Sequence, residues 1–182
     1  MSRYCPLTNS KTVYLNCQEC DEKICEETFY LLIAGSRSYD NYKEFSLICD
    51  HMLSQANIPV CIVSGGAKGA DFLAEKYAKE KGYQLKVFPA DWNQFGKSAG
   101  HLRNRQMHEF IAKHKKRGCL CFWDGSSKGT FSNFKMARDN NTPLVVWNFV
   151  TKNYQKIRRN SDESPELLGE KIPDERKGSM MD

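Results

Sequence analysis

The chain has 182 residues, of which 40% are hydrophobic and 27% are charged, and this globular composition excludes wholesale disorder. Its formal charge of +5 is too small for a histone-like or polybasic protein. No apolar run approaches the roughly 18 residues of a membrane helix, and the N-terminus lacks the apolar core of a signal peptide, so we expect a cytoplasmic protein with no membrane segment.

Composition divides the chain into three zones. Residues 1–28 hold four of the eight cysteines, residues 29–150 hold nearly all the long apolar runs, and residues 151–182 are polar. The middle zone has 17 basic and 10 acidic residues, a net +7, whereas the first zone is net −2 and the last is neutral. We therefore expect a Cys-rich segment, one folded domain over 29–150, and a flexible or partner-binding extension after it.

The N-terminal cysteines follow a C-x11-C-x2-C-x4-C pattern, whose central pair has the spacing of a zinc knuckle. A segment this short cannot build its own core, so a bound metal would explain how it folds. We expect a structural zinc ion held by Cys5, Cys17, Cys20 and Cys25. The alternative is an arm with free thiols that could form a redox pair. The other cysteines lie in apolar runs and are expected to be buried: Cys49, Cys61, Cys119 and Cys121.

Short apolar runs in the middle zone predict five strands, at residues 29–34, 60–63, 85–88, 119–123 and 144–147. Helical periodicity between them predicts four helices, at residues 45–52, 70–81, 107–114 and 131–137. This regular alternation predicts an α/β fold, a Rossmann-like three-layer sandwich with a mostly parallel sheet of five or more strands.

Ligands of such folds bind in the loops at the carboxyl ends of the strands. The loops after the first four strands are rich in Gly, Ser, Asp and cationic residues. The candidate binding residues in these loops are Gly35, Ser36, Arg37, Ser64, Gly65, Gly66, Lys68, Gly69, Ala70, Asp71, Asp91, Trp92, Gly125, Ser126, Ser127, Lys128, Gly129 and Thr130.

Two of these loops, Gly65–Asp71 and Gly125–Thr130, have the character of phosphate sites. Each runs from glycines into the start of a helix, where free N–H groups and the helix dipole attract anions. Lys68 and Lys128 would add positive charge. Neither loop has the spacing of a Walker A or a G-x-G-x-x-G motif, and Gly-rich turns also serve only to join strands to helices.

Several side chains allow both a structural and a functional interpretation. Arg103, Asn104 and Arg105 at the start of the third helix could hold a phosphate or form a solvated helix face. For both Asp71 and Asp91 the functional interpretation is a contact to ribose hydroxyls or a catalytic role. Asp71 fits a helix cap better, whereas Asp91 fits a turn and the functional interpretation equally well. Trp92 could stack on a base or pack at the rim of the core.

Five motifs together resemble the SLOG superfamily, most closely its YspA-like branch, over residues 29–150. They are Ile33–Arg37, Val63–Asp71, Phe88–Trp92, Gly100–Met107 and Phe122–Thr130. The resemblance implies a Rossmannoid domain that binds a nucleotide or a nucleotide-derived small molecule, such as an ADP-ribose derivative, as a sensor or a processing protein. It also implies a homo-oligomer.

Two related groups supply alternative functions. LONELY GUY phosphoribohydrolases cleave the N-glycosidic bond of nucleoside monophosphates with a Glu three residues after a Gly-Thr pair. Here Gly129 and Thr130 match that pair but Asn133 stands at the Glu position, so a hydrolase would need another carboxylate such as Asp91 or Asp71. DNA-processing protein A has a loop similar to 64–71, and the net +7 domain suits a single-stranded DNA backbone.

Overall fold

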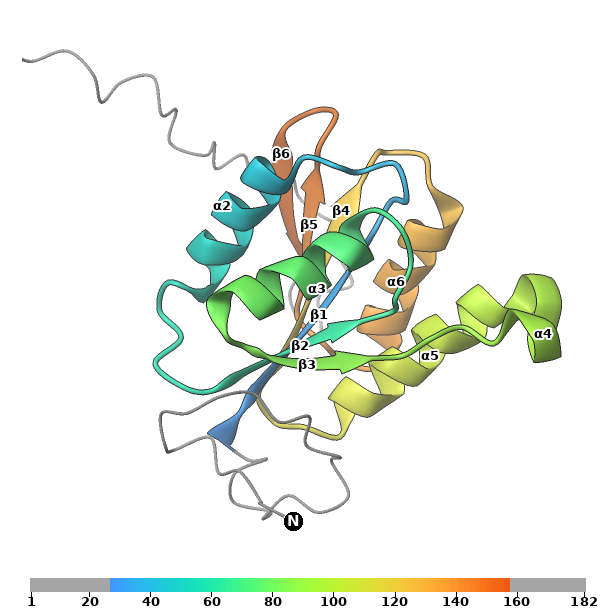
Figure 1. The fold of residues 1–182 in the computed structure, drawn as a ribbon, viewed down its shortest axis with the longest axis horizontal. Helices are drawn as coiled ribbons and strands as arrows, with labels where there is room; N and C mark the ends of the chain where they lie inside the picture. The colour runs from blue at the N-terminus through green and yellow to red at the C-terminus, as the bar shows by residue number, and fades with distance from the viewer. Residues whose placement is uncertain (1–26, 158–182) are drawn as a thin grey trace, which may run out of the picture.

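A six-stranded sheet with the strand order β3-β2-β1-β4-β5-β6 forms the centre of the computed structural model, which describes residues 27–157 (Figure 1). Neighbouring strands run parallel from β3 to β5, and β6 is antiparallel to β5. The strands are β1 (Phe29–Gly35), β2 (Val60–Ser64), β3 (Gln84–Val87), β4 (Arg117–Trp123), β5 (Leu144–Asn148) and β6 (Asn153–Ile157).

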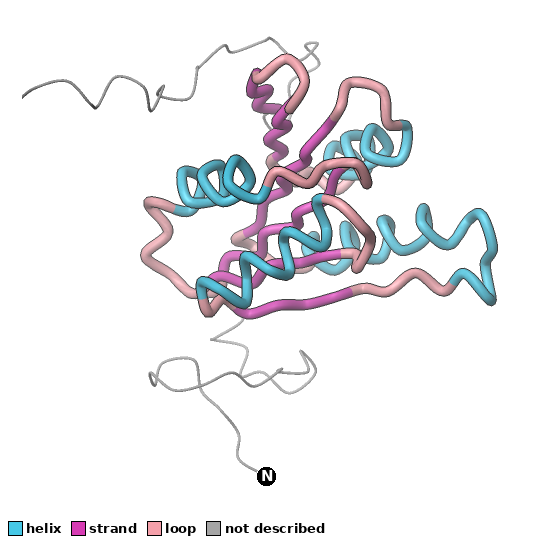
Figure 2. The backbone as a smooth tube through the Cα atoms, turned by 45° about the horizontal axis from the view of Figure 1, so that its top comes forward, coloured by secondary structure: helices cyan, strands magenta, loops and turns pink. Residues whose placement is uncertain are grey.

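Helices cover both faces of this sheet and complete the expected three-layer α/β sandwich (Figure 2). On one face, α2 (Tyr42–Leu53) and α3 (Ala70–Lys81) pack on Leu31 and Ile33 of β1. On the other face, α5 (Ala99–Ala112) and α6 (Lys128–Asp139) pack on alternate residues of the same strand. Burial on both faces is the reason why the central strands read as continuous apolar runs.

A short helical segment precedes α5 and projects from one end of the sandwich (Figure 2). It consists of α4 (Trp92–Phe95) and a 3-10 turn, η1 (Gly96–Ser98). All its residues are exposed. The apolar pattern did not predict either element, because neither buries a face.

The helix predicted at residues 107–114 begins eight residues earlier than expected, at Ala99. The buried side of its first turns includes Arg103 and Asn104, and polar residues on a buried face hide the helical pattern. Arg103 and Arg105 therefore lie one turn inside the helix, and their predicted place at its start was wrong.

The sheet continues past the predicted domain end at residue 150. Residues Asn153–Ile157 form β6 and pair with β5, so the prediction of a polar extension from residue 151 was wrong for this stretch. Tyr154 packs its ring on Trp147, with ring centroids 4.7 Å apart, and this contact explains how a polar strand is held at the sheet edge. The remainder of the predicted extension lies outside the described residues.

The cysteines of the domain are buried, as predicted: Cys49, Cys61, Cys119 and Cys121. The four proposed zinc ligands lie outside the described residues. Within residues 27–157 no cluster of three or more potential metal ligands occurs. None of the helices in this range has the length and hydropathy that a membrane span requires.

Candidate functional site

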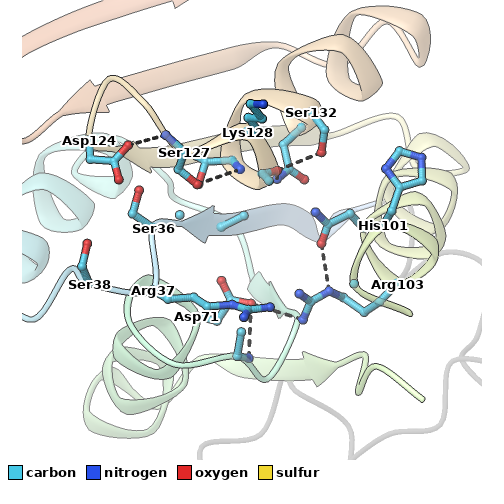
Figure 3. A pocket seen from close by; sticks show the side chains of 18 of the residues that line it. Ser36, Arg37, Ser38, Asp71, His101, Arg103, Asp124, Ser127, Lys128 and Ser132 are labelled. Carbon is cyan, nitrogen blue, oxygen red and sulfur yellow. Dashed lines mark hydrogen bonds and ion pairs between the residues drawn. The ribbon is translucent and has the colours of Figure 1, made fainter. Parts of the chain in front are cut away.

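A cavity of about 660 Å³ opens where the strand order of the sheet reverses. From β1 the chain builds the sheet outward through β2 and β3, and then returns so that β4 lies on the other side of β1. The loops after β1 and β4 diverge there and leave a crevice, which is the usual ligand position in open α/β sheets. Residues from both loops and from α5 line the crevice (Figure 3).

A second cavity of about 460 Å³ adjoins the first and lies over the β2–α3 loop and residues 89–90. Arg37, Ala67, Trp92 and Arg103 line both cavities, which we therefore call the main lobe and the side lobe of one cleft. The Arg37 guanidinium lies 5.7 Å from the ring centroid of Trp92, a cation–π distance. This pair stands between the two lobes.

The first turn of α6 presents backbone N–H groups to the main lobe. Ser127 is the N-cap: its Oγ accepts from the Thr130 N–H, and its carbonyl oxygen accepts from Phe131. Two N–H groups of the first turn, those of Lys128 and Gly129, are left without an acceptor in the described structure. Both residues line the main lobe, and free N–H groups at the start of a helix are favourable contacts for an anion.

The β2–α3 loop, the other predicted phosphate site, uses three of its N–H groups internally. The Gly66 N–H donates to Ser64 Oγ at 3.2 Å, and the Ala67 N–H donates to Asp71 Oδ2 at 3.4 Å. The Ala70 N–H donates to the Ser36 carbonyl. A phosphate at the Ala67 N–H would therefore compete with the Asp71 carboxylate.

Arg103 of α5 holds the β2–α3 loop in place. Its guanidinium donates to the Gly65 carbonyl, lies 3.5 Å from Asp71 Oδ2, and donates through Nε to Asn104 Oδ1 at 2.8 Å. Burial raises the pKa of the Asp71 carboxyl above its ordinary value, while the Arg103 charge and the loop N–H groups oppose that rise. Asp71 is therefore a structural partner of the loop, but its carboxylate does not cap α3 as the sequence interpretation proposed.

Asp124, in the loop after β4, is a pocket carboxylate that was not among the predicted residues. Its Oδ1 accepts from the backbone N–H groups of Ser126 at 2.8 Å and Ser127 at 2.6 Å. Burial alone would raise its pKa, but these hydrogen bonds, together with the nearby Ser36 and Ser126 hydroxyls, lower it below the ordinary value. Asp124 is therefore an anion at neutral pH.

Asn133 lies in the wall of the main lobe and is held by two hydrogen bonds. Its Nδ2 donates to the Gly129 carbonyl at 3.2 Å, and its Oδ1 lies 3.1 Å from Nε2 of the buried His108. An Oδ1 acceptor requires Nε2 of His108 to carry its proton. The amide at the position of the hydrolase Glu is thus fixed in orientation and supplies no base to the cleft.

The structure brings most of the predicted residues together at the cleft. The predicted residues that line one or both lobes are Gly35, Ser36, Arg37, Gly65, Gly66, Lys68, Asp71, Trp92, Arg103, Asn104, Ser127, Lys128, Gly129 and Thr130. Those that line neither are Ser64, Gly69, Ala70, Asp91, Arg105, Gly125 and Ser126. Asp91 is exposed and accepts from the Gln94 N–H as the N-cap of α4, which is its structural interpretation.

Several polar residues of the main lobe were not among the predicted binding residues. They are Lys97 of η1, His101 of α5, Ser132 and Asn133 of α6, and Ser38 and Asp124 of the loops. A longer α5 in the sequence interpretation would have included His101.

Three comparisons found known proteins that are similar to this chain. The model of the YspA, cpYpsA-related SLOG family matches residues 30–95. The Gene 61 protein of Mycobacterium phage D29 is 32% identical over 121 residues, which cover 63% of this chain and 93% of that protein.

Two solved structures are similar in fold. DNA processing protein A from Helicobacter pylori, whose structure concerns single-stranded DNA binding, has a TM-score of 0.45 at 19% identity, over 69% of this chain and 68% of that one. DNA processing protein A from Streptococcus pneumoniae has a TM-score of 0.47 at 14% identity, over 67% of this chain and 51% of that one.

Proposed function

The chain belongs to the YspA, cpYpsA-related SLOG family, and from that premise we propose that it binds a nucleotide or nucleotide-derived small molecule in the main lobe. The observation that carries the proposal is the start of α6, where the Lys128 and Gly129 N–H groups face a cavity at the reversal of strand order. A phosphate at that helix end would meet free donors and the positive end of the helix dipole.

The charge of the cleft supports the same ligand class. Arg37, Lys97, Arg103 and Lys128 all line the main lobe, against the acids Asp71 and Asp124. Asp71 is already paired with Arg103, so the other three cations are available to a bound anion. A cavity of about 660 Å³ is also in the usual size range for a small-molecule site.

Binding without hydrolysis is the form of this function that the side chains favour. Asn133 stands where the related hydrolases have Glu, Asp71 is paired with Arg103, and Asp91 lies outside the cleft lining. Release of free base from a nucleoside 5′-monophosphate, lost in Asp71→Asn or Asp91→Asn, would contradict this and support a phosphoribohydrolase.

The proposal is tested by calorimetric titration with nucleoside 5′-phosphates and ADP-ribose, using two variants at one position. Lys128→Ala removes the ammonium group, whereas Lys128→Pro removes both the ammonium group and the N–H. Proline fits the first helical position, and Ser127 before it is extended, as proline requires. We expect weaker binding in Lys128→Ala and a further loss of about five-fold or more in Lys128→Pro.

Lys135→Ala is the matched control, since Lys135 is an exposed lysine of α6 that does not line the cleft. Failure of every nucleotide to bind the wild-type protein would refute the proposal. Equal binding by Lys128→Ala and Lys128→Pro would show that the Lys128 N–H at the start of α6 does not contact the ligand.

Single-stranded DNA is a second candidate, and the exposed aromatic residues beside the side lobe favour it. Trp92 is 50% exposed and Phe95 is 42% exposed, and Arg37 stacks on Trp92. Successive bases stack on such rings in single-strand binding proteins, next to cations that contact the phosphates. This function predicts binding that strengthens with oligonucleotide length and weakens steeply with salt, with both effects reduced in Trp92→Ala.

A further inference from the structure

One end of the main lobe has a negatively charged side chain, whereas most charged side chains of the cleft are positive. Asp124 lines this end, and its Oδ1 is occupied by the Ser126 and Ser127 N–H groups. Its Oδ2 accepts no hydrogen bond of normal geometry and forms no ion pair within residues 27–157. A free carboxylate oxygen repels phosphate, so the ligand group that it accepts must be a hydrogen-bond donor.

A buried hydroxyl with no partner lies at the same end. Ser36 is only 2% exposed, lines the main lobe, and points toward the loop that carries Asp124 (Figure 3). Its Oγ makes no hydrogen bond of normal geometry within the described structure, although it lies near enough to lower the pKa of Asp124. A buried polar atom without a partner is uncommon in native proteins, and a bound ligand is one explanation for it.

The backbone around Ser36 is fixed, so its hydroxyl is held in position before any ligand arrives. Its N–H donates to the Phe122 carbonyl at 2.9 Å, and its carbonyl accepts from the Tyr39 and Ala70 N–H groups. Two acceptors, Asp124 Oδ2 and Ser36 Oγ, are thus presented side by side, on strand ends that adjoin in the sheet. Adjacent acceptors of this kind match a pair of neighbouring hydroxyl groups.

We propose that Asp124 and Ser36 form a ribose subsite that binds the 2′- and 3′-hydroxyls of a ribonucleotide and discriminates against deoxyribose. The inference rests on the proposed function, because it places the sugar of the same ligand whose phosphate meets the start of α6. It also separates the two candidate functions, since single-stranded DNA has no 2′-hydroxyl and its internal 3′-oxygens are esterified.

The test is calorimetric titration with the four nucleoside 5′-monophosphates in ribo, 2′-deoxy and 3′-deoxy form, at one salt concentration. We expect at least one ribonucleotide to bind more tightly than both of its deoxy forms, and about ten-fold or more tightly than the form that loses its hydrogen bond to the charged Asp124. Asp124→Asn should bring this ratio close to one. Its amide oxygen can still accept from Ser126 and Ser127, so the loop is retained.

Two further variants complete the design. Ser36→Ala should lower the same ratio by removing the second acceptor, and Asp139→Asn, an exposed acid of α6, should leave it unchanged. Equal binding of ribo and deoxy forms to the wild-type protein would overturn the ribose subsite and leave nucleotide binding in place. Binding of no nucleotide at all would overturn both.

Discussion

The Arg103 guanidinium lies 3.5 Å from the Asp71 carboxylate, and both side chains are more than nine-tenths buried. Arg103 comes from α5 on one face of the sheet, and Asp71 comes from α3 on the other. The same guanidinium also donates to the Gly65 carbonyl, so it joins the two faces at the β2–α3 loop. The side lobe of the cleft depends on this ion pair for its shape.

Removing one member of this pair should strongly destabilise the protein. Arg103→Ala leaves the Asp71 carboxylate buried without its cation, and a loss of about 3–5 kcal/mol in the free energy of unfolding is expected. Urea denaturation measures it. Arg138→Ala, which breaks an ion pair exposed at the end of α6, should change stability by less than about 1 kcal/mol. Similar small losses in both variants would show that the buried pair contributes little.

The sequence predicted the layers of the fold well, because strands that are buried on both faces have nearly continuous apolar sequences. Leu31 and Ile33 pack against the helices on one face of the sheet, and Leu32 and Ala34 pack against the helices on the other face. The start of α5 was missed because its buried positions hold Arg103 and Asn104. Arg103 binds Gly65 and Asp71, which lie 38 and 32 residues away in the sequence, and Asn104 accepts from Arg103. Those contacts exist only in the folded chain.

The candidate site was predicted in outline but not in its chemistry. The loops after β1 and β4 were chosen correctly as cleft loops. The sequence could not show that Asp71 accepts from the Ala67 N–H of the β2–α3 loop, or that the Lys128 and Gly129 N–H groups have no acceptor in the described structure. Asp124 was not singled out in the sequence, and only the folded chain brings it close to the buried Ser36 hydroxyl.

Gly35 is needed where β1 passes close to β4 and α3. A Cβ atom added there would lie 2.5 Å from the Phe122 carbonyl oxygen and 2.6 Å from the Ala70 Cβ, neither of which can move freely. Gly35→Ala should therefore cost about 1–3 kcal/mol in thermal unfolding.

Gly129→Ala is the matched control for Gly35→Ala. No atom lies within 4 Å of a Cβ added at Gly129, which is helical, so this change should be neutral or should stabilise the protein by up to about 1 kcal/mol. If Gly35→Ala leaves the stability unchanged, β1 and β4 can move apart at this position with little loss of free energy.

His108 should make the protein less stable in mild acid. Burial lowers its pKa from 6.5 to about 4, against a smaller opposing effect of its hydrogen bond to Asn133. The unfolded chain then binds a proton that the folded chain does not, so stability is complete above pH 6.5 and falls as the pH drops toward 4. The loss amounts to about 3 kcal/mol when the pH reaches 4.

The check is urea denaturation between pH 4 and 7.5, for the wild-type protein and His108→Gln. Glutamine stays neutral and can still donate to Asn133, so the variant should lose this part of the pH dependence. At pH 7.5, where His108 is neutral, the difference in stability between the wild-type protein and His108→Gln reflects only the change in packing. A pKa of 6 or higher for His108 in an NMR titration would contradict the prediction.

The N-terminal cysteines should bind one zinc ion per chain. This proposal comes from spacing alone, since Cys5, Cys17, Cys20 and Cys25 lie outside the described residues. Metal analysis of the purified protein should find about one equivalent, and Cys20→Ser should reduce it. Cys61→Ser, at a thiol buried within the domain, is the control and should leave the metal content unchanged. Much less than one equivalent in the wild-type protein would count against the site.

Glu44 connects β6 to the rest of the domain. Its Oε1 accepts from the Tyr39 hydroxyl at 3.0 Å and from the Trp147 indole N–H at 3.1 Å, and its Oε2 pairs with Lys152 in the turn before β6. Tyr39 and Trp147 are buried, so Glu44→Ala would leave two donors without an acceptor and should cost about 2 kcal/mol or more in unfolding free energy.

The two halves of this contact can be separated by comparing three variants in urea denaturation. Lys152→Ala removes only the half-exposed ion pair and should cost less than about 1 kcal/mol. Glu44→Gln keeps one oxygen for Tyr39 and Trp147 and should resemble Lys152→Ala. If Lys152→Ala instead costs as much as Glu44→Ala, the ion pair holds β6 in place, and the buried hydrogen bonds contribute little.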